Sequence, residues 1–126
     1  EAAVEIVQEA LKKYVGLYEG YWLSGMREKT GLTTNRDNDK ALIDELFELM
    51  ATNQADFTLT FYYLSKLEID SLERDKEVRA LFNDAEQFDH WASKWRKRLR
   101  EKEIDDTTRQ LRMQAVNPVY IPRNHQ

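Results

Sequence analysis

The chain has 126 residues, of which 41% are hydrophobic and 33% are charged, and its formal net charge is −4. This length suits one domain and is too short for two independent hydrophobic cores. Because acidic and basic residues are interspersed, no overall cationic field exists to attract a nucleic acid or an anionic membrane surface. Four glycines and two prolines are few for an all-β protein, so the composition favours helices.

Cysteine is absent, and no apolar run approaches the roughly 20 residues that span a bilayer. The lack of cysteine fits a reducing compartment and excludes disulfides and thiolate metal sites within this chain. The first residues lack a basic segment followed by an apolar block, so we expect a soluble, cytoplasmic protein without an export signal. The chain also begins without methionine, as a piece of a longer protein would.

A long first helix is predicted from Val4 onward, where apolar residues adopt the alternating three-and-four spacing that buries one helical face. The residues of that face are Val7, Leu11, Tyr14, Tyr18 and Tyr21. Within the helix lie Gly16, Gly20 and Gly25, each of which weakens it by about 1 kcal/mol relative to alanine. We expect them to mark close packing or a break, and Gly31 to form the C-terminal cap.

The polar stretch Thr33–Asp39 predicts a loop with several N-cap candidates. A second helix of about three turns should follow through Leu42–Met50, where the helical period resumes. The next apolar segment, Phe57–Leu64, alternates as a strand would, but it also fits helical spacing, and Asp56 can cap it. Since no second strand is available for pairing, we predict a helix there.

A short turn of helix is expected within Arg74–Phe82. After it, a strongly amphipathic helix is predicted to begin at Asp84 and to end near Ile104. Its core face consists of Phe88, Trp91, Trp95 and Leu99.

The last predicted helix can be capped by Asp105 or Asp106. It must end near Asn117, because Pro118 pushes the residue before it out of helical geometry. No internal repeat or long linker divides the chain. We therefore predict an all-α fold, a compact bundle of about five helices that forms a single domain over residues 1–126.

The segment KWRKRLREK, Lys94–Lys102, is a dense run of positive charge that could grip phosphates. However, Trp91, Trp95 and Leu99 recur at helical spacing, so the basic side chains should mostly occupy the outward face of a helix whose aromatic face is core. We favour a solvated surface, and we keep docking to the rest of a larger protein and nucleic-acid binding as alternatives.

Other candidate sites fail on spacing. The segment Asp37–Glu48 has acids at the first and twelfth positions of a calcium loop, but Ala41 and Leu42 stand where an oxygen ligand and the turn glycine are required. His90 and His125 are far apart and have no ligand-like spacing. None of four serines lies in a nucleophile elbow: Ser24, Ser65, Ser71 and Ser93. The residues themselves therefore predict no catalytic, cofactor-binding or metal-binding group.

Four segments nevertheless form a recognisable ordered set. They are Gly25–Leu32 (GMREKTGL), Leu42–Ser65, Leu81–Leu99 and Arg112–Asn124 (RMQAVNPVYIPRN). The last contains the most specific signature, Asn-Pro-x-Tyr-Ile-x-Arg-Asn, formed by Asn117, Pro118, Tyr120, Ile121, Arg123 and Asn124. In this order the segments resemble the C-terminal half of the selenoprotein O family, the YdiU-like proteins of bacteria. Pro122 departs from that family, which usually has an aliphatic residue there.

The resemblance implies a piece of a kinase-like enzyme that binds ATP in a reversed orientation and transfers AMP, with Mg²⁺ or Mn²⁺, onto protein Ser, Thr or Tyr hydroxyls. The family's phosphate loop, its lysine–glutamate ion pair and its metal-binding Asp and Asn lie upstream, and their motifs are absent here. The resemblance therefore implies a fold and a parent activity, and no catalytic residue in this chain. The implied partners are the remainder of the parent chain and its protein substrates, in the bacterial cytoplasm, with no nucleic acid and no membrane.

The signature itself has a structural interpretation. Pro118 ends a helix, Tyr120 and Ile121 should insert into the bundle as apolar anchors, and Arg123 with Asn124 can engage carbonyls or cap the segment after them. A direct part in nucleotide or substrate binding and a merely disordered end are the alternatives.

Two further possibilities concern the whole chain. One is a free-standing helical interaction module that docks a protein partner through an exposed aromatic patch containing Trp91 or Tyr120. The other is a homodimer, since a region cut from a larger enzyme should expose apolar surface that once met the catalytic core.

Overall fold

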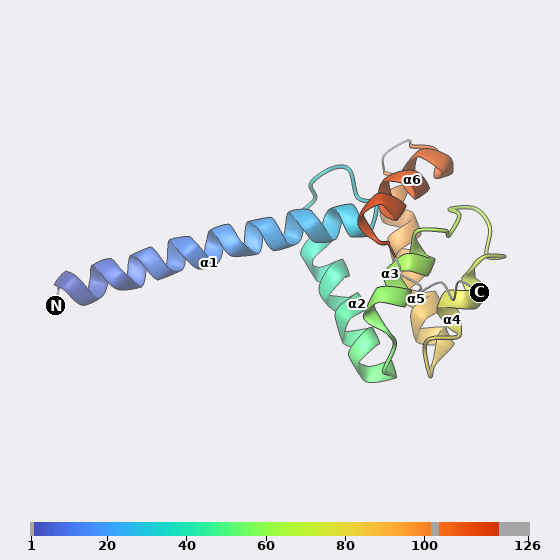
Figure 1. Cartoon of the computed structure of the whole chain (residues 1–126), viewed down its shortest axis with the longest axis horizontal. Coiled ribbons are helices and arrows are strands. Elements are labelled where there is room, and N and C mark those ends of the chain that lie inside the picture. Colours follow the sequence, from blue (N-terminus) through green and yellow to red (C-terminus); the bar gives the residue numbers. More distant parts are fainter. Residues whose placement is uncertain (1, 102–103, 119–126) are drawn as a thin grey trace, which may run out of the picture.

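The computed structural model describes residues 2–101 and 104–118. Within these ranges the chain forms six α-helices and no strand, which confirms the predicted all-α fold. The helices are α1 (Ala2–Lys29), α2 (Asp39–Asn53), α3 (Phe57–Leu64), α4 (Asp75–Arg79), α5 (Ala85–Leu99) and α6 (Asp106–Val116). Helices α2 to α6 pack together with the C-terminal end of α1, while most of α1 extends away from them (Figure 1).

Three helices start where the sequence predicts, because an aspartate caps each of them. The side chains of Asp56, Asp84 and Asp105 accept hydrogen bonds from backbone amides two or three residues further on, at 2.8, 3.1 and 3.0 Å. Helix α5 ends at Leu99 and not near Ile104: the Arg100 amide still bonds to Arg96 O at 3.1 Å, but the Glu101 amide bonds to Arg98 O, three residues back, at 3.2 Å. Helix α2 has 15 residues, which is about four turns instead of three.

Helix α5 forms the centre of the core. Phe88, Trp91, Trp95 and Leu99 are all buried, as predicted from their spacing. Each indole N–H donates to a backbone carbonyl of another element: Trp91 to Leu42 and Trp95 to Thr30, both at 2.8 Å. The two tryptophans therefore bury large apolar surfaces without leaving a polar atom unsatisfied, and they fix α5 against α2 and the end of α1.

The predicted burial of one face of the first helix is wrong. The residues concerned, Val7, Leu11, Tyr14, Tyr18 and Tyr21, are all exposed, with Tyr21 at 79%. Helix α1 meets the rest of the chain from Trp22 onward, where the Trp22 ring lies 5.7 Å from that of Phe47. The turns before it project beyond the other helices, so nothing in the described part of the chain covers them (Figure 1).

The glycines of α1 divide into two kinds. The helix continues unbroken through Gly16, Gly20 and Gly25, and a methyl group at any of them would meet no atom within 4 Å, so they mark neither close packing nor a break. Gly31 is different. It has φ of +77° and lies where a Cβ atom would be 2.7 Å from Met113 Sδ, so it ends α1 and lets α6 approach.

Candidate functional site

The first residue of the signature ties the last helix to the first. Asn117 is buried, and its side-chain amide donates to the Lys29 carbonyl at 3.0 Å. In return the Lys29 ammonium donates to Asn117 Oδ1 at 3.2 Å and to the Val116 carbonyl at 3.1 Å. Pro118 follows the end of α6 and is exposed. These contacts give Asn117 a structural role that its position in the sequence alone did not reveal.

The other four signature residues, Tyr120, Ile121, Arg123 and Asn124, lie outside the described residues, and so does His125. Their predicted roles as anchors and caps remain predictions. The second histidine, His90, is exposed on α5.

A buried ion cluster surrounds Asp39, which also lies in the rejected calcium loop. Its side chain has no exposed surface and accepts hydrogen bonds from Arg98 Nε at 2.7 Å, Arg27 Nε at 2.8 Å and the Arg36 backbone amide at 3.0 Å. Burial acts to raise the pKa of this carboxyl group, but the hydrogen bonds from Arg98, Arg27 and Arg36 outweigh burial and hold the pKa below its ordinary value. Asp39 therefore joins α1, α2 and α5 as an ionised structural group.

A second buried pair joins Arg96 and Asp75 in a bidentate arrangement. The Arg96 guanidinium donates to the two Asp75 oxygens at 2.7 and 3.0 Å, and to the Glu68 and Ser71 carbonyls at 2.8 and 3.3 Å. All its donor nitrogens are thus engaged. This bidentate geometry is typical of a structural ion pair, and it joins α5 to α4 and to the segment before α4.

The interpretation of Lys94–Lys102 as a solvated basic surface is wrong for two of its members. Arg96 and Arg98 are only 5% and 7% exposed, because each reaches a buried carboxylate from another element. Lys94 and Arg100 do face solvent, and they pair with acids there at 2.9 and 3.3 Å. The predicted aromatic docking patch is also wrong with respect to Trp91, which is fully buried.

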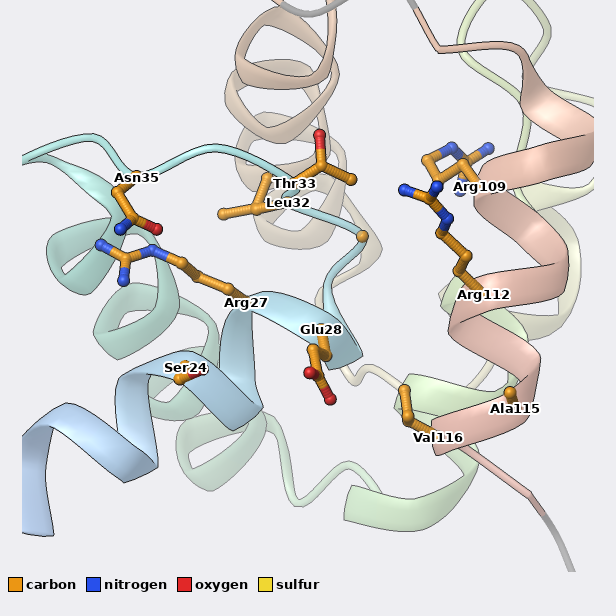
Figure 2. A pocket seen from close by; sticks show the side chains of 11 residues that line it. Ser24, Arg27, Glu28, Leu32, Thr33, Asn35, Arg109, Arg112, Ala115 and Val116 are labelled. Carbon is orange, nitrogen blue, oxygen red and sulfur yellow. The ribbon is translucent and has the colours of Figure 1, made fainter.

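A pocket of about 530 Å³ lies between the end of α1, the loop after it and α6 (Figure 2). Its lining includes Ser24, Arg27 and Glu28 from α1, Gly31, Leu32, Thr33 and Asn35 from the loop, and Arg109, Arg112, Ala115 and Val116 from α6. The side chains of Arg109 and Arg112 extend from α6 toward the loop, while Arg27 extends from α1 toward Asn35. No local pattern in the sequence pointed to this pocket, because the residues of α6 lie more than 70 positions away from those of α1 and the loop.

Arg109 is the unusual residue of this pocket. It is 1% exposed, lies 5.4 Å from the Trp95 ring, and donates to Leu67 O and, at 3.2 Å, to Asp106 Oδ1. Its Nε atom is buried and has no hydrogen-bond acceptor in the part of the chain that the structure describes. Burial lowers the pKa of the guanidinium, against the opposing effect of Asp106. Arg109 therefore carries a buried positive charge beside the cavity, and its Nε–H is left without a partner among the described residues.

Exposed apolar side chains gather on α1, and we call this surface the α1 face. It consists of Ile6, Val7, Leu11, Tyr14, Val15, Leu17, Tyr18 and Tyr21. At 3.6 residues per turn these positions cover roughly half of the helix circumference. Contiguous apolar surface of this kind marks an interaction site far more often than scattered single residues do. The described helices include none long and apolar enough to cross a membrane, and α1 itself is interrupted by charges.

Comparison with known proteins identifies the family of this chain. A family model described as "Protein adenylyltransferase SelO" matches residues 2–126. The Protein nucleotidyltransferase YdiU of Bradyrhizobium diazoefficiens is 46% identical over 125 residues, which is 99% of this chain and 25% of that protein. Its counterpart in Methylorubrum populi is 44% identical over 98% of this chain and 26% of that protein. The counterpart in Rhizobium meliloti is 38% identical over 99% of this chain and 25% of that protein.

The chain thus spans about a quarter of the length of the curated relatives that it matches. The match confirms the resemblance drawn from the four ordered segments, because the family model covers all of them. This chain therefore belongs to the SelO family, the family of the YdiU protein nucleotidyltransferases.

Proposed function

We propose that this chain is the C-terminal helical region of a SelO-type protein adenylyltransferase, and that it supports the catalytic part of the protein without performing chemistry itself. The observation that carries this proposal is the α1 face, whose eight large apolar side chains are half or more exposed. An exposed apolar surface of this size is typical of a site that packs against another polypeptide segment. The longer relatives contain such a segment, since about three quarters of their length has no counterpart in this chain.

The charged residues of the described chain support the same division of labour. Asp39, Asp75, Arg96 and Arg98 are buried in mutual ion pairs, and each joins two or more elements. Groups spent in this way stabilise the fold and are not available to a substrate. Within residues 2–101 and 104–118 no cluster of three or more His, Asp or Glu side chains is placed to hold a metal ion.

The proposed activity belongs to the longer protein, which we call the parent protein. There the upstream region would bind ATP with Mg²⁺ or Mn²⁺ and transfer AMP to Ser, Thr or Tyr hydroxyls of protein substrates. The helical region would hold that upstream region in place through the α1 face. The alternative of a free-standing interaction module has less support, because the family match extends over residues 2–126.

Two measurements test this proposal. Titration of Mg-ATP into the 126-residue chain in a calorimeter should give no binding heat, whereas the parent protein should bind it. With ATP labelled at the α-phosphate, the parent protein should transfer label to protein substrates and the 126-residue chain should not. Tight Mg-ATP binding by the isolated chain would contradict the proposed division of labour.

A further inference from the structure

Two arginines of α6, Arg109 and Arg112, line the pocket between α1 and α6. Arg112 is exposed at its wall and makes no hydrogen bond or ion pair with the residues that the structure describes. Arg109 contributes a buried guanidinium charge, which pairs with Asp106 at 3.2 Å. Both side chains extend from α6 toward the loop that follows α1 (Figure 2). Two positive charges at one wall of a cavity, one of them on an accessible donor, favour an anionic group.

The rest of the lining limits the kind of anion. Arg27 is committed to Asp39 at 2.8 Å, so it offers little additional positive charge. Glu28 lines the pocket and would repel a doubly charged group such as a phosphate. Leu32, Ala115 and Val116 add apolar wall. This combination suits a single carboxylate on a short aliphatic stem, which is an aspartate or glutamate side chain.

The pocket is continuous with the α1 face. Leu17 and Tyr21 belong to the α1 face, while Ser24 and Glu28 line the pocket. The four follow one another at spacings of four, three and four residues, and therefore lie along one line of the helix. A polypeptide segment that runs along the apolar line reaches the pocket at its end.

We propose that the pocket receives the carboxylate of an aspartate or glutamate from the segment of the parent protein that covers the α1 face. Arg112 donates to that carboxylate, the buried positive charge of Arg109 attracts it, and the walls formed by Leu32 and Val116 contact its stem. This inference rests on the proposed function, because it requires the upstream region of the parent protein as the occupant. The length of the relatives beyond this chain supplies such a segment.

The experiment uses the whole parent protein with the substitution Arg112→Lys, which places a primary amine at the pocket. Arg112 is exposed, so this variant should fold. A carbodiimide joins amines to carboxylates that are already in contact, and mass spectrometry of the peptides then identifies the partner. Lys94 and Glu45, which are 2.9 Å apart, provide an internal positive control. We expect the new amine to couple to an acidic residue outside residues 1–126, and the unsubstituted protein to lack that product.

Coupling of the new amine to Glu28 alone, or to nothing while Lys94 couples to Glu45, would overturn the pocket proposal. Hydrogen exchange over residues 5–21 separates this failure from failure of the proposed function. Slow exchange of α1 in the parent protein, compared with fast exchange in the 126-residue chain, indicates that the α1 face is covered. If α1 is covered and the new amine stays uncoupled, the pocket proposal alone is wrong. If α1 exchanges fast in both proteins, the proposed docking of α1 is wrong as well.

Discussion

Two buried carboxylates, Asp39 and Asp75, carry the charges that are most costly to place in this fold. A carboxylate without water is tolerated only when cations and hydrogen bonds replace the lost hydration. Asp39 accepts four hydrogen bonds, at 2.7, 2.8, 3.0 and 3.2 Å, and Asp75 accepts two from Arg96, at 2.7 and 3.0 Å. Removal of one partner would leave the others charged and buried, so these positions should be far more sensitive than ion pairs at the surface.

Asp39→Asn should therefore lower the free energy of unfolding by about 3 kcal/mol, because it leaves Arg27 and Arg98 without a counter-charge. Asp44→Asn is the matched control, since Asp44 pairs with Lys40 at 2.8 Å but is 46% exposed, and it should change stability by less than about 0.5 kcal/mol. Urea unfolding of both variants at pH 7 measures the difference. Equal losses in the two variants would contradict the assigned role of Asp39.

Acid should reduce the difference between the wild type and Asp39→Asn. The folded-state pKa of Asp39 is depressed, so its stabilising effect is fully present above the unfolded pKa of about 3.9 and is lost as the pH falls through the folded value. The variant has no group to titrate at this position, and the other carboxyl groups affect both proteins alike. Unfolding curves at pH 7 and pH 3 should show a smaller gap at pH 3. A constant or wider gap would mean that another group carries the effect.

For single residues, the sequence predicts which apolar side chains are buried, but it does not predict which charged side chains are buried. Helical spacing identified Phe88, Trp91 and Trp95 as core, because that information is local. The same spacing assigned Arg96 and Arg98 to the surface. Their burial depends on carboxylates 21 and 59 residues away, and no local pattern records those contacts.

Among the elements, the end of α1 is the most constrained. Gly31 turns the chain with positive φ and leaves room for Met113 and Arg109 of α6. Lys29 and Asn117 exchange hydrogen bonds beside it. The contact between α1 and α6 thus depends on a residue without a side chain. The identity of Gly31 as a cap was predictable from its position after a helical pattern, whereas the close approach of α6 was not.

A pair of glycine substitutions tests this assignment. Gly31→Ala should destabilise the protein by about 1–3 kcal/mol, since alanine is strained at φ of +77° and its Cβ would lie 2.7 Å from Met113 Sδ. Gly20→Ala should instead stabilise α1 by up to about 1 kcal/mol, because a methyl group there meets nothing within 4 Å and alanine favours a helix. Unfolding midpoints from circular dichroism, together with total helicity, distinguish the two. Similar shifts in both variants would contradict this difference.

The whole molecule combines a packed group of helices with a projecting arm. The packed part was largely predictable, because its helices carry their own periodicity and three of them, α3, α5 and α6, begin at a capping aspartate. The apolar stripe on α1 was also identified correctly, but the prediction placed its cover inside this chain. Periodicity shows that a face is to be buried, and it does not show which polypeptide buries it. Exposure of the stripe here, together with relatives about four times as long, makes the α1 face an intramolecular interface of the parent protein in our proposal.

This interpretation predicts that one substitution has different effects in two contexts. In the 126-residue chain Tyr18→Lys should change the free energy of unfolding by less than about 0.5 kcal/mol, because Tyr18 is 64% exposed there. In the parent protein the same change should cost about 1–3 kcal/mol, since a charge would replace a buried aromatic side chain. Glu9→Lys is the matched control, because it lies nine residues and two and a half turns away, on the opposite side of α1, and should be neutral in both proteins. If Tyr18→Lys were also neutral in the parent protein, the α1 face would remain open there and would have to serve a separate partner.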